Sequence, residues 1–137
     1  MTIRVARVLE TCLYARNLVE AAAFYREILG LEPISSVPGR HVFFRCGDGV
    51  FLLFDPDRTE LTGGDVPPHG ARGPGHVAFA VPPEELSAWP ARLAGHGVPV
   101  EADVSWPRGG RSLYVRDPAG NSVEFTTPGI WGLPERV

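Results

Sequence analysis

The chain repeats its own order of elements, and this duplication limits its possible folds more than any other sequence feature. A strand-like run, an amphipathic helix and three more strand-like runs occupy residues 7–55, and the same order returns over residues 76–126. A shift of 71 residues aligns the later parts of the two halves without a gap and brings Arg45 onto Arg116. A repeated order of elements with matching residues indicates an internal repeat. We therefore expect an α+β fold built from two βαβββ modules.

The helix of the first half has clear signals at both ends. Asn17 is a favoured N-cap residue, Glu20 stands three positions later as in a capping box, and Gly30 suits the position after a helix C-terminus. Apolar residues at helical spacing predict one buried face, formed by Leu18, Ala21, Ala22, Tyr25 and Leu29. The strand-like runs of this half cover residues 7–15, 32–37, 40–46 and 50–55, with a hairpin turn at 47–49.

The second half follows the same plan with a less regular helix. The helical pattern covers residues 83–94, and Pro90 within it predicts a kink or an early break. The strand-like runs of this half cover residues 76–81, 98–104, 111–116 and 121–126.

Residues 56–75 lie between the two halves and contain nine Gly or Pro residues. That composition predicts a connector without helix or strand. We expect a single domain over residues 1–137, with one module at about 5–55, the connector, a second module at about 76–127 and a tail at 128–137.

Composition excludes several classes of protein. The formal net charge is −3 and no basic cluster is present, which argues against a nucleic-acid partner. All 13 basic residues are Arg, so neither a Schiff-base lysine nor a P-loop lysine exists. No apolar run is long enough to span a membrane, and the N-terminus does not resemble a signal peptide. Because Cys12 and Cys46 lie far apart without a C-x-x-C motif, we expect reduced thiols and a cytoplasmic protein without a membrane partner.

Three side chains in mainly apolar strands are candidate metal ligands. Glu10 and His76 occupy equivalent places on the first strands of the two halves, and Glu124 lies on the last strand. Two carboxylates and one neutral imidazole balance a divalent ion, and these donors suit Ni, Zn, Mn, Co or Fe. Three protein ligands would leave positions open for a substrate, as in catalytic sites. The alternative is structural: both carboxylates pair with arginines, and His76 is an ordinary strand-edge residue.

Strand alternation predicts which side chains face a cavity. Glu124 shares a face of its strand with Ser122 and Thr126, whereas Val123 and Phe125 face the helices. The same reasoning places Phe51, Leu53 and Asp55 on the cavity side of the corresponding first-half strand. The substrate-binding candidates on these faces are His41, Phe43, Arg45, Leu53, Ser112 and Tyr114. An arginine there could hold an anion through two hydrogen bonds, although we expect Arg116 to fix the neighbouring turn instead.

Three segments carry a resemblance to a known family. They are LYARNLVEAAAFYREILGL, GPGHVAFAV and LYVRDPAGNSVEF. From about Val5 to Thr127 the chain resembles the vicinal oxygen chelate superfamily, which includes glyoxalase I, extradiol dioxygenases, fosfomycin-resistance transferases, methylmalonyl-CoA epimerase and bleomycin-resistance proteins. The resemblance implies paired βαβββ modules that form a curved, mixed eight-stranded cup, usually in a homodimer, with a divalent metal ion in the cup. His76 and Glu124 match ligand positions of that family.

Two positions depart from the family pattern. Glu10 stands where many members have His or Gln, and Leu53 falls where glyoxalase I has a fourth ligand. The four-ligand site is therefore incomplete, and one His with two carboxylates differs from the two-His, one-carboxylate set of extradiol iron enzymes.

From this resemblance we expect a metal-dependent enzyme similar to glyoxalase, a lyase or isomerase of a small oxygen-chelating substrate. The metal would act as a Lewis acid, and Glu124 or Glu10 would move a proton as the general base. Two alternatives stay open. One is a metal-free protein that binds a small molecule or antibiotic, as bleomycin-resistance proteins do, and the other is an extradiol-type dioxygenase.

Overall fold

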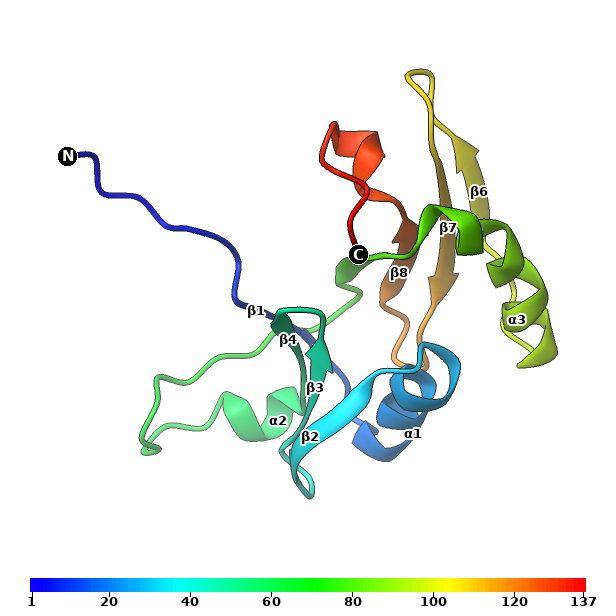
Figure 1. The fold of residues 1–137 in the computed structure, drawn as a ribbon. Coiled ribbons are helices and arrows are strands. Elements are labelled where there is room, and N and C mark those ends of the chain that lie inside the picture. Colours follow the sequence, from blue (N-terminus) through cyan, green and yellow to red (C-terminus); the bar gives the residue numbers. More distant parts are fainter.

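The computed structural model describes residues 1–137 and contains two four-stranded sheets, one in each half of the chain (Figure 1). The strand orders are β1-β4-β3-β2 and β5-β8-β7-β6, so each sheet has the same topology. In each sheet the first strand runs parallel to the last, and the other pairs are antiparallel. The strands are β1 Glu10–Tyr14, β2 Glu32–Val37, β3 His41–Cys46, β4 Gly49–Phe54, β5 His76–Ala80, β6 Ala102–Ser105, β7 Arg111–Arg116 and β8 Ser122–Thr126.

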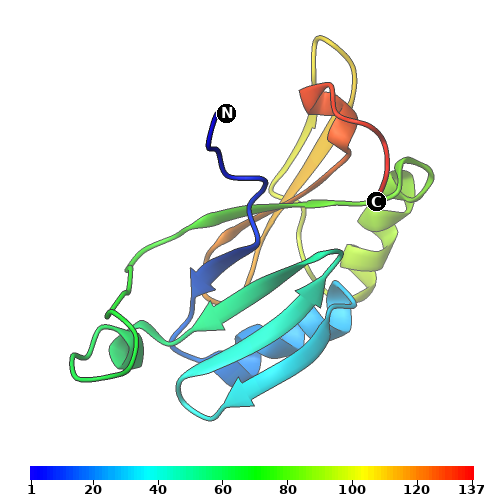
Figure 2. The same ribbon diagram turned by 60° about the vertical axis from the view of Figure 1, so that its left-hand side comes forward.

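The two predicted βαβββ modules are confirmed by this topology. The predicted α+β fold class is confirmed as well, and within one chain its eight strands form two four-stranded sheets that no ladder joins. β1 and β5 each lie at the edge of their sheet and therefore keep one backbone edge without a strand partner. Residues 1–9, which the strand pattern partly included, precede β1 without regular structure and extend away from the fold (Figure 1, Figure 2).

The first helix begins and ends as the sequence predicts. Oδ1 of Asn17 accepts a hydrogen bond from the Glu20 amide at 3.1 Å, which caps α1 (Leu18–Ala23). The helix continues as a π-helical turn, η1 (Phe24–Ile28), and Gly30 follows it with a φ of +74°. Figure 2 shows this helix against one face of the first sheet.

The second helix is divided in two, as Pro90 predicts. A 3-10 helix, η2 (Pro83–Ala88), precedes α3 (Trp89–Gly95). Pro90 lies in the first turn of α3, where a missing backbone N–H costs no intrahelical hydrogen bond. The tail forms one short 3-10 helix, η3 (Pro128–Trp131).

The connector contains one helical turn that the Gly and Pro content did not predict. α2 (Pro56–Thr59) is capped by Asp55, whose Oδ1 accepts a hydrogen bond from the Asp57 amide at 2.9 Å. The proline at the first helical position is preorganised for such a turn. None of the helices has the length and apolar character that crossing a bilayer requires.

Both sheets turn one face toward a shared core around Tyr25. The Tyr25 ring is fully buried, with its centroid 4.8 Å from that of Phe51 in the first sheet and 6.2 Å from that of Phe79 in the second. The Tyr25 hydroxyl donates a 2.6 Å hydrogen bond to Asp117 in the β7–β8 turn. The opposite face of each sheet, here called its open face, therefore carries the residues that can form a site.

Candidate functional site

The pairing of the strands corrects the sequence alignment of the two halves by one residue. Arg45 pairs with Val50, so residues 46–49 lie between them, whereas Arg116 pairs with Ser122 across residues 117–121. The second turn is one residue longer, and the shift between the last strands becomes 72 rather than 71. The counterpart of Glu124 is therefore Leu52 and not Leu53.

The prediction that Leu53 lines the cavity is wrong for this reason. Leu53 has no exposed surface and belongs to the hydrophobic core, as does Phe51. Asp55, for which alternation predicts the same side, caps α2. Since Leu52 is also unable to bind a metal, the fourth ligand position remains without a donor.

The open face of the second sheet carries the residues that alternation predicts there. Val123 and Phe125 belong to the core, so Ser122, Glu124 and Thr126 point to the open face. Strand pairing adds neighbours from β5 and β7 to this face, namely His76, Ala78, Ala80, Ser112, Tyr114 and Arg116.

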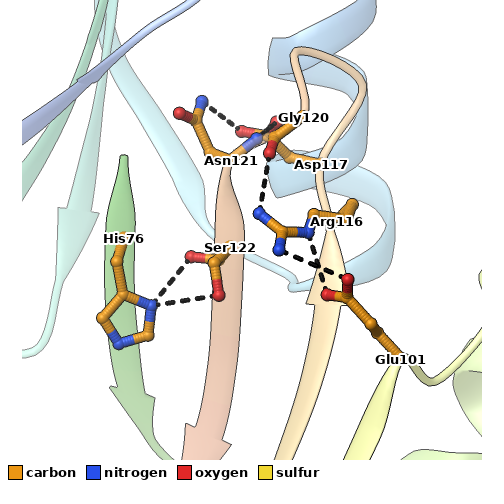
Figure 3. Close-up of polar contacts among 7 residues, drawn as sticks. All are labelled: His76, Glu101, Arg116, Asp117, Gly120, Asn121 and Ser122. Carbon is orange, nitrogen blue, oxygen red and sulfur yellow. Dashed lines mark hydrogen bonds and ion pairs between the residues drawn. The ribbon is translucent and has the colours of Figure 1, made fainter. Parts of the chain in front are cut away.

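His76 and Glu124 lie side by side on this face. Nε2 of His76 is 3.2 Å from Oε1 of Glu124, whose side chain is only 8% exposed while that of His76 is 50% exposed. Nδ1 of His76 lies 3.2 Å from both the carbonyl oxygen and the hydroxyl of Ser122 (Figure 3). When Nδ1 donates to the Ser122 carbonyl, the lone pair of Nε2 faces the carboxylate, and a cation between the two would bind both.

Tyr114 completes a polar group with this pair. It pairs with Glu124 across β7 and β8, and its ring centroid is 6.3 Å from that of His76. Burial and the negative charge of Glu124 raise the pKa of Tyr114 above its ordinary value. The group therefore offers a hydroxyl donor beside one imidazole and one carboxylate, two kinds of side chain that can bind a metal ion.

Two further candidates on this face are already occupied by other contacts. The Ser112 hydroxyl accepts a 2.8 Å hydrogen bond from Nε1 of Trp106 and donates to Thr126 at 3.1 Å, and Ser112 is fully buried. In one chain it is thus not accessible to a substrate, contrary to prediction. Arg116 binds both carboxylate oxygens of Glu101 and donates to the Gly120 carbonyl at 3.1 Å, so it fixes the turn as expected (Figure 3).

The open face of the first sheet is a regular array of three rows. Pairing of β1, β4 and β3 places one residue of each strand in each row. From the start of β1 to its end, the rows are Glu10, Val50 and Arg45, then Cys12, Leu52 and Phe43, then Tyr14, Phe54 and His41.

The predicted residues on this face differ in their surroundings. Arg45 is exposed and makes no ion pair, so it is free to bind an anionic group. His41 is buried and stacks on Phe43 with ring centroids 3.9 Å apart, and its Nδ1 accepts a 2.6 Å hydrogen bond from Arg40. Burial, followed by the charge of Arg40, lowers the pKa of His41.

Glu10 is exposed at the start of β1 and is not gathered with the other two predicted ligands. The chain contains no group of three or more His, Cys, Asp or Glu side chains that could hold a metal ion. The three predicted ligands are therefore not brought together within one chain. The physical reason is that Glu10 and the pair of His76 and Glu124 lie on different sheets that no ladder joins.

Sequence reasoning missed a contact between Tyr14 and His69. The Tyr14 hydroxyl lies 2.6 Å from Nδ1 of His69, and the His69 ring packs edge-on against Phe54 with centroids 4.6 Å apart. Burial raises the pKa of Tyr14 to about 12, with a smaller contribution from Cys12. Alternation from Glu10 would have placed Tyr14 on the open face, but nothing in the connector sequence indicates where His69 lies.

Comparison with known proteins gives one family and several similar structures. Residues 6–125 match the family model described as the Glyoxalase/Bleomycin resistance protein/Dioxygenase superfamily. The crystal structure of lactoylglutathione lyase from Agrobacterium tumefaciens is 42% identical in sequence, with a TM-score of 0.92 over 96% of this chain and 100% of that one. A comparison with curated protein sequences gives no match.

Two more distant structures have the same fold. A glyoxalase/bleomycin resistance protein/dioxygenase from Nocardioides is 24% identical, with a TM-score of 0.73 over 99% of this chain and 92% of that one. The genomically encoded fosfomycin resistance protein FosX from Listeria monocytogenes is 22% identical, with a TM-score of 0.68 over 90% of this chain and 93% of that one.

Proposed function

The chain belongs to the Glyoxalase/Bleomycin resistance protein/Dioxygenase superfamily, and on that premise we propose that it is a metal-dependent lyase or isomerase of the glyoxalase kind. Its substrate is a small molecule that binds through two adjacent oxygen atoms. The observation that carries this proposal is the approach of His76 Nε2 to Glu124 Oε1 at 3.2 Å on an open sheet face.

The donor chemistry of this pair fits a divalent metal ion. Ser122 fixes the orientation of the His76 ring through Nδ1, which leaves Nε2 directed toward the carboxylate. Ni, Zn, Mn, Co or Fe accept this combination of nitrogen and oxygen donors. When bound, such an ion supplies Lewis-acid stabilisation of the negative charge that develops on substrate oxygen.

We propose that Glu10 of a second copy is the third ligand. Glu10 and His76 both lie on edge strands, β1 and β5, which have no neighbour on one side. Pairing β1 of one copy with β5 of another would form an eight-stranded sheet and bring the two residues toward one another. The functional unit is then a homodimer with two sites.

The chain's own residues supply the proton chemistry. A carboxylate oxygen of Glu124 or Glu10 accepts a proton from the substrate carbon beside the chelating oxygens and returns it to the neighbouring carbon. The Tyr114 hydroxyl donates a hydrogen bond to substrate oxygen. Arg45 binds an anionic part of the substrate when one is present.

The reaction class is supported by the relative called lactoylglutathione lyase, which is 42% identical to this chain. Leu52 stands at the fourth ligand position of this chain, so we propose a three-ligand site and not the four-ligand site of glyoxalase I. The same class of proton transfer would then take place with a more open coordination sphere.

The proposal is tested by metal analysis. We expect about one transition-metal equivalent per chain after purification without chelators, and its loss in Glu124→Gln and His76→Ala. Glu101→Gln is a matched control, because Glu101 pairs with Arg116 on the same sheet and should leave the metal content unchanged. A protein that holds no metal, even after incubation with Ni, Zn, Mn, Co and Fe, would refute the metal-dependent reaction.

One observation favours a second function, that of a metal-free binding protein. The open face of the first sheet carries the half-buried ring of Phe43 beside the buried apolar side chains of Phe54 and Leu52. A protein without metal that binds an aromatic compound unchanged would support this alternative. Oxygen consumption with bound iron would instead indicate an extradiol-type dioxygenase.

A further inference from the structure

The open face around Glu10 changes from polar to aromatic over a short distance. Glu10, Val50 and Arg45 form its first row, and the next row consists of Cys12, Leu52 and Phe43. Same-face residues on a strand are about 7 Å apart, so the apolar row begins one such step from the candidate ligand Glu10.

The apolar region continues into the third row through direct ring contacts. Phe43 and Phe54 meet edge-on with centroids 5.4 Å apart, and Phe43 stacks on His41 at 3.9 Å with an interplanar angle of 10°. Phe43 is only half-buried, so one side of this aromatic cluster remains available to a ligand. Edge-on and stacked contacts of this kind are the arrangements in which aromatic rings bind further rings.

The only charged side chains in the first two rows are Glu10 and Arg45. The middle row has none, and the buried His41 in the third row accepts a hydrogen bond from Arg40 in its neutral form. A charged or strongly hydrated substituent on the middle row would lose water without gaining a partner within that row, whereas an apolar ring would be stabilised by burial.

We propose that the substrate carries an aromatic or similarly flat apolar ring joined directly to its oxygen-chelating group. This inference rests on the proposed metal site and specifies the class of substrate that the site accepts. The chelating oxygens lie at the metal near Glu10, and the ring lies against Phe43 and Cys12, the half-buried side chains of the second row. Phe43 is then a specificity-determining residue, since it contacts the part of the substrate that does not react.

Two hydroxamates that differ only in the group attached to the chelating head test this proposal. Benzohydroxamate carries a phenyl ring and acetohydroxamate a methyl group, and both are titrated into the zinc-loaded full chain by calorimetry. We expect benzohydroxamate to bind at least about tenfold more tightly, because only its ring buries apolar surface on this face. In Phe43→Ala the ratio should fall to near unity, with the affinity for acetohydroxamate unchanged.

Matched variants keep the result interpretable. Trp131→Ala removes an aromatic side chain that is 79% exposed in the tail and should leave the ratio unchanged. Phe43→Leu preserves apolar volume if the alanine variant fails to fold, and should still reduce the preference for the ring.

The outcomes separate this inference from the function on which it rests. Equal affinity for the two hydroxamates, or a preference that survives in both Phe43 variants, would overturn the aromatic substrate class and leave the metal site intact. Failure of both hydroxamates to bind the zinc-loaded chain, with no difference from Glu124→Gln, would overturn the metal site and the substrate class together.

Discussion

The hydroxyl of Tyr25 donates a 2.6 Å hydrogen bond to Oδ2 of Asp117, and this buried contact joins the helix of the first module to the β7–β8 turn of the second. Asp117 also holds that turn together, because its Oδ1 accepts hydrogen bonds from the amides of Ala119 and Asn121, both at 2.9 Å. Asn121 in turn donates to the Tyr14 carbonyl at 3.1 Å. One carboxylate therefore links the turn beside the candidate site to the packing of the two modules.

Removal of the Tyr25 hydroxyl should destabilise the whole chain. In Tyr25→Phe the carboxylate loses a buried donor, and we expect the free energy of unfolding to fall by about 1–3 kcal/mol. Urea denaturation followed by circular dichroism measures this change. Tyr114→Phe is the control, because that hydroxyl lies on a half-exposed residue and its removal should cost less. An equal fall in the free energy of unfolding in the two variants would show that the Tyr25–Asp117 hydrogen bond contributes no more to stability than the Tyr114 hydroxyl does.

A methyl group at Gly49 should disturb the pairing of β1 with β4. A Cβ at this position would lie 2.8 Å from the Leu9 carbonyl oxygen, a backbone atom that accepts a hydrogen bond from Val50. We expect Gly49→Ala to cost about 1–3 kcal/mol of stability, because the start of β1 must shift. Thermal unfolding tests this. Gly95→Ala, at the end of α3 and without neighbours within 4 Å, should be neutral or stabilising.

The buried His41 should make the free energy of unfolding depend on pH. The pKa of His41 is lowered in the folded chain from its ordinary value of about 6.5. At a pH below 6.5, His41 therefore binds a proton more readily in the unfolded chain than in the folded one. The contribution of neutral His41 is therefore present above that pH and is lost as the pH falls below it. The stability difference between the natural chain and His41→Gln should shrink between pH 7 and pH 5. Parallel pH profiles for the two chains would contradict this prediction.

The sequence predicted correctly those features that depend on neighbouring residues along the chain. Alternation along 122–126 placed Glu124 on the open face, and the same period brings His76 beside it because β5 and β8 pair in parallel. The N-cap Asn17 and the break before Pro90 depend on nearest neighbours only, and both are observed.

It failed where a side chain's surroundings depend on loop length or on distant contacts. Because the β7–β8 turn has one extra residue, aligning the two halves without a gap matched Glu124 with Leu53, which lies in the core. Trp106 covers Ser112 from six residues away, and His69 reaches Tyr14 across 55 residues of sequence. Such contacts depend on the folded arrangement of loops and strands, so the alternation of residues along a strand does not predict them.

The assignment of Glu10 to a second copy predicts complementation between two inactive chains. Glu10→Ala and Glu124→Gln should each bind no metal as homodimers, because every site lacks one ligand. In a mixed dimer one site loses both ligands, while the other combines Glu10 of the second variant with His76 and Glu124 of the first. Co-refolding equal amounts should therefore restore metal to about a quarter of the sites, since half of the dimers are mixed and each holds one intact site. Metal content after gel filtration measures this fraction. If both ligands came from one chain, mixing would restore nothing, and the homodimeric site would have to be abandoned.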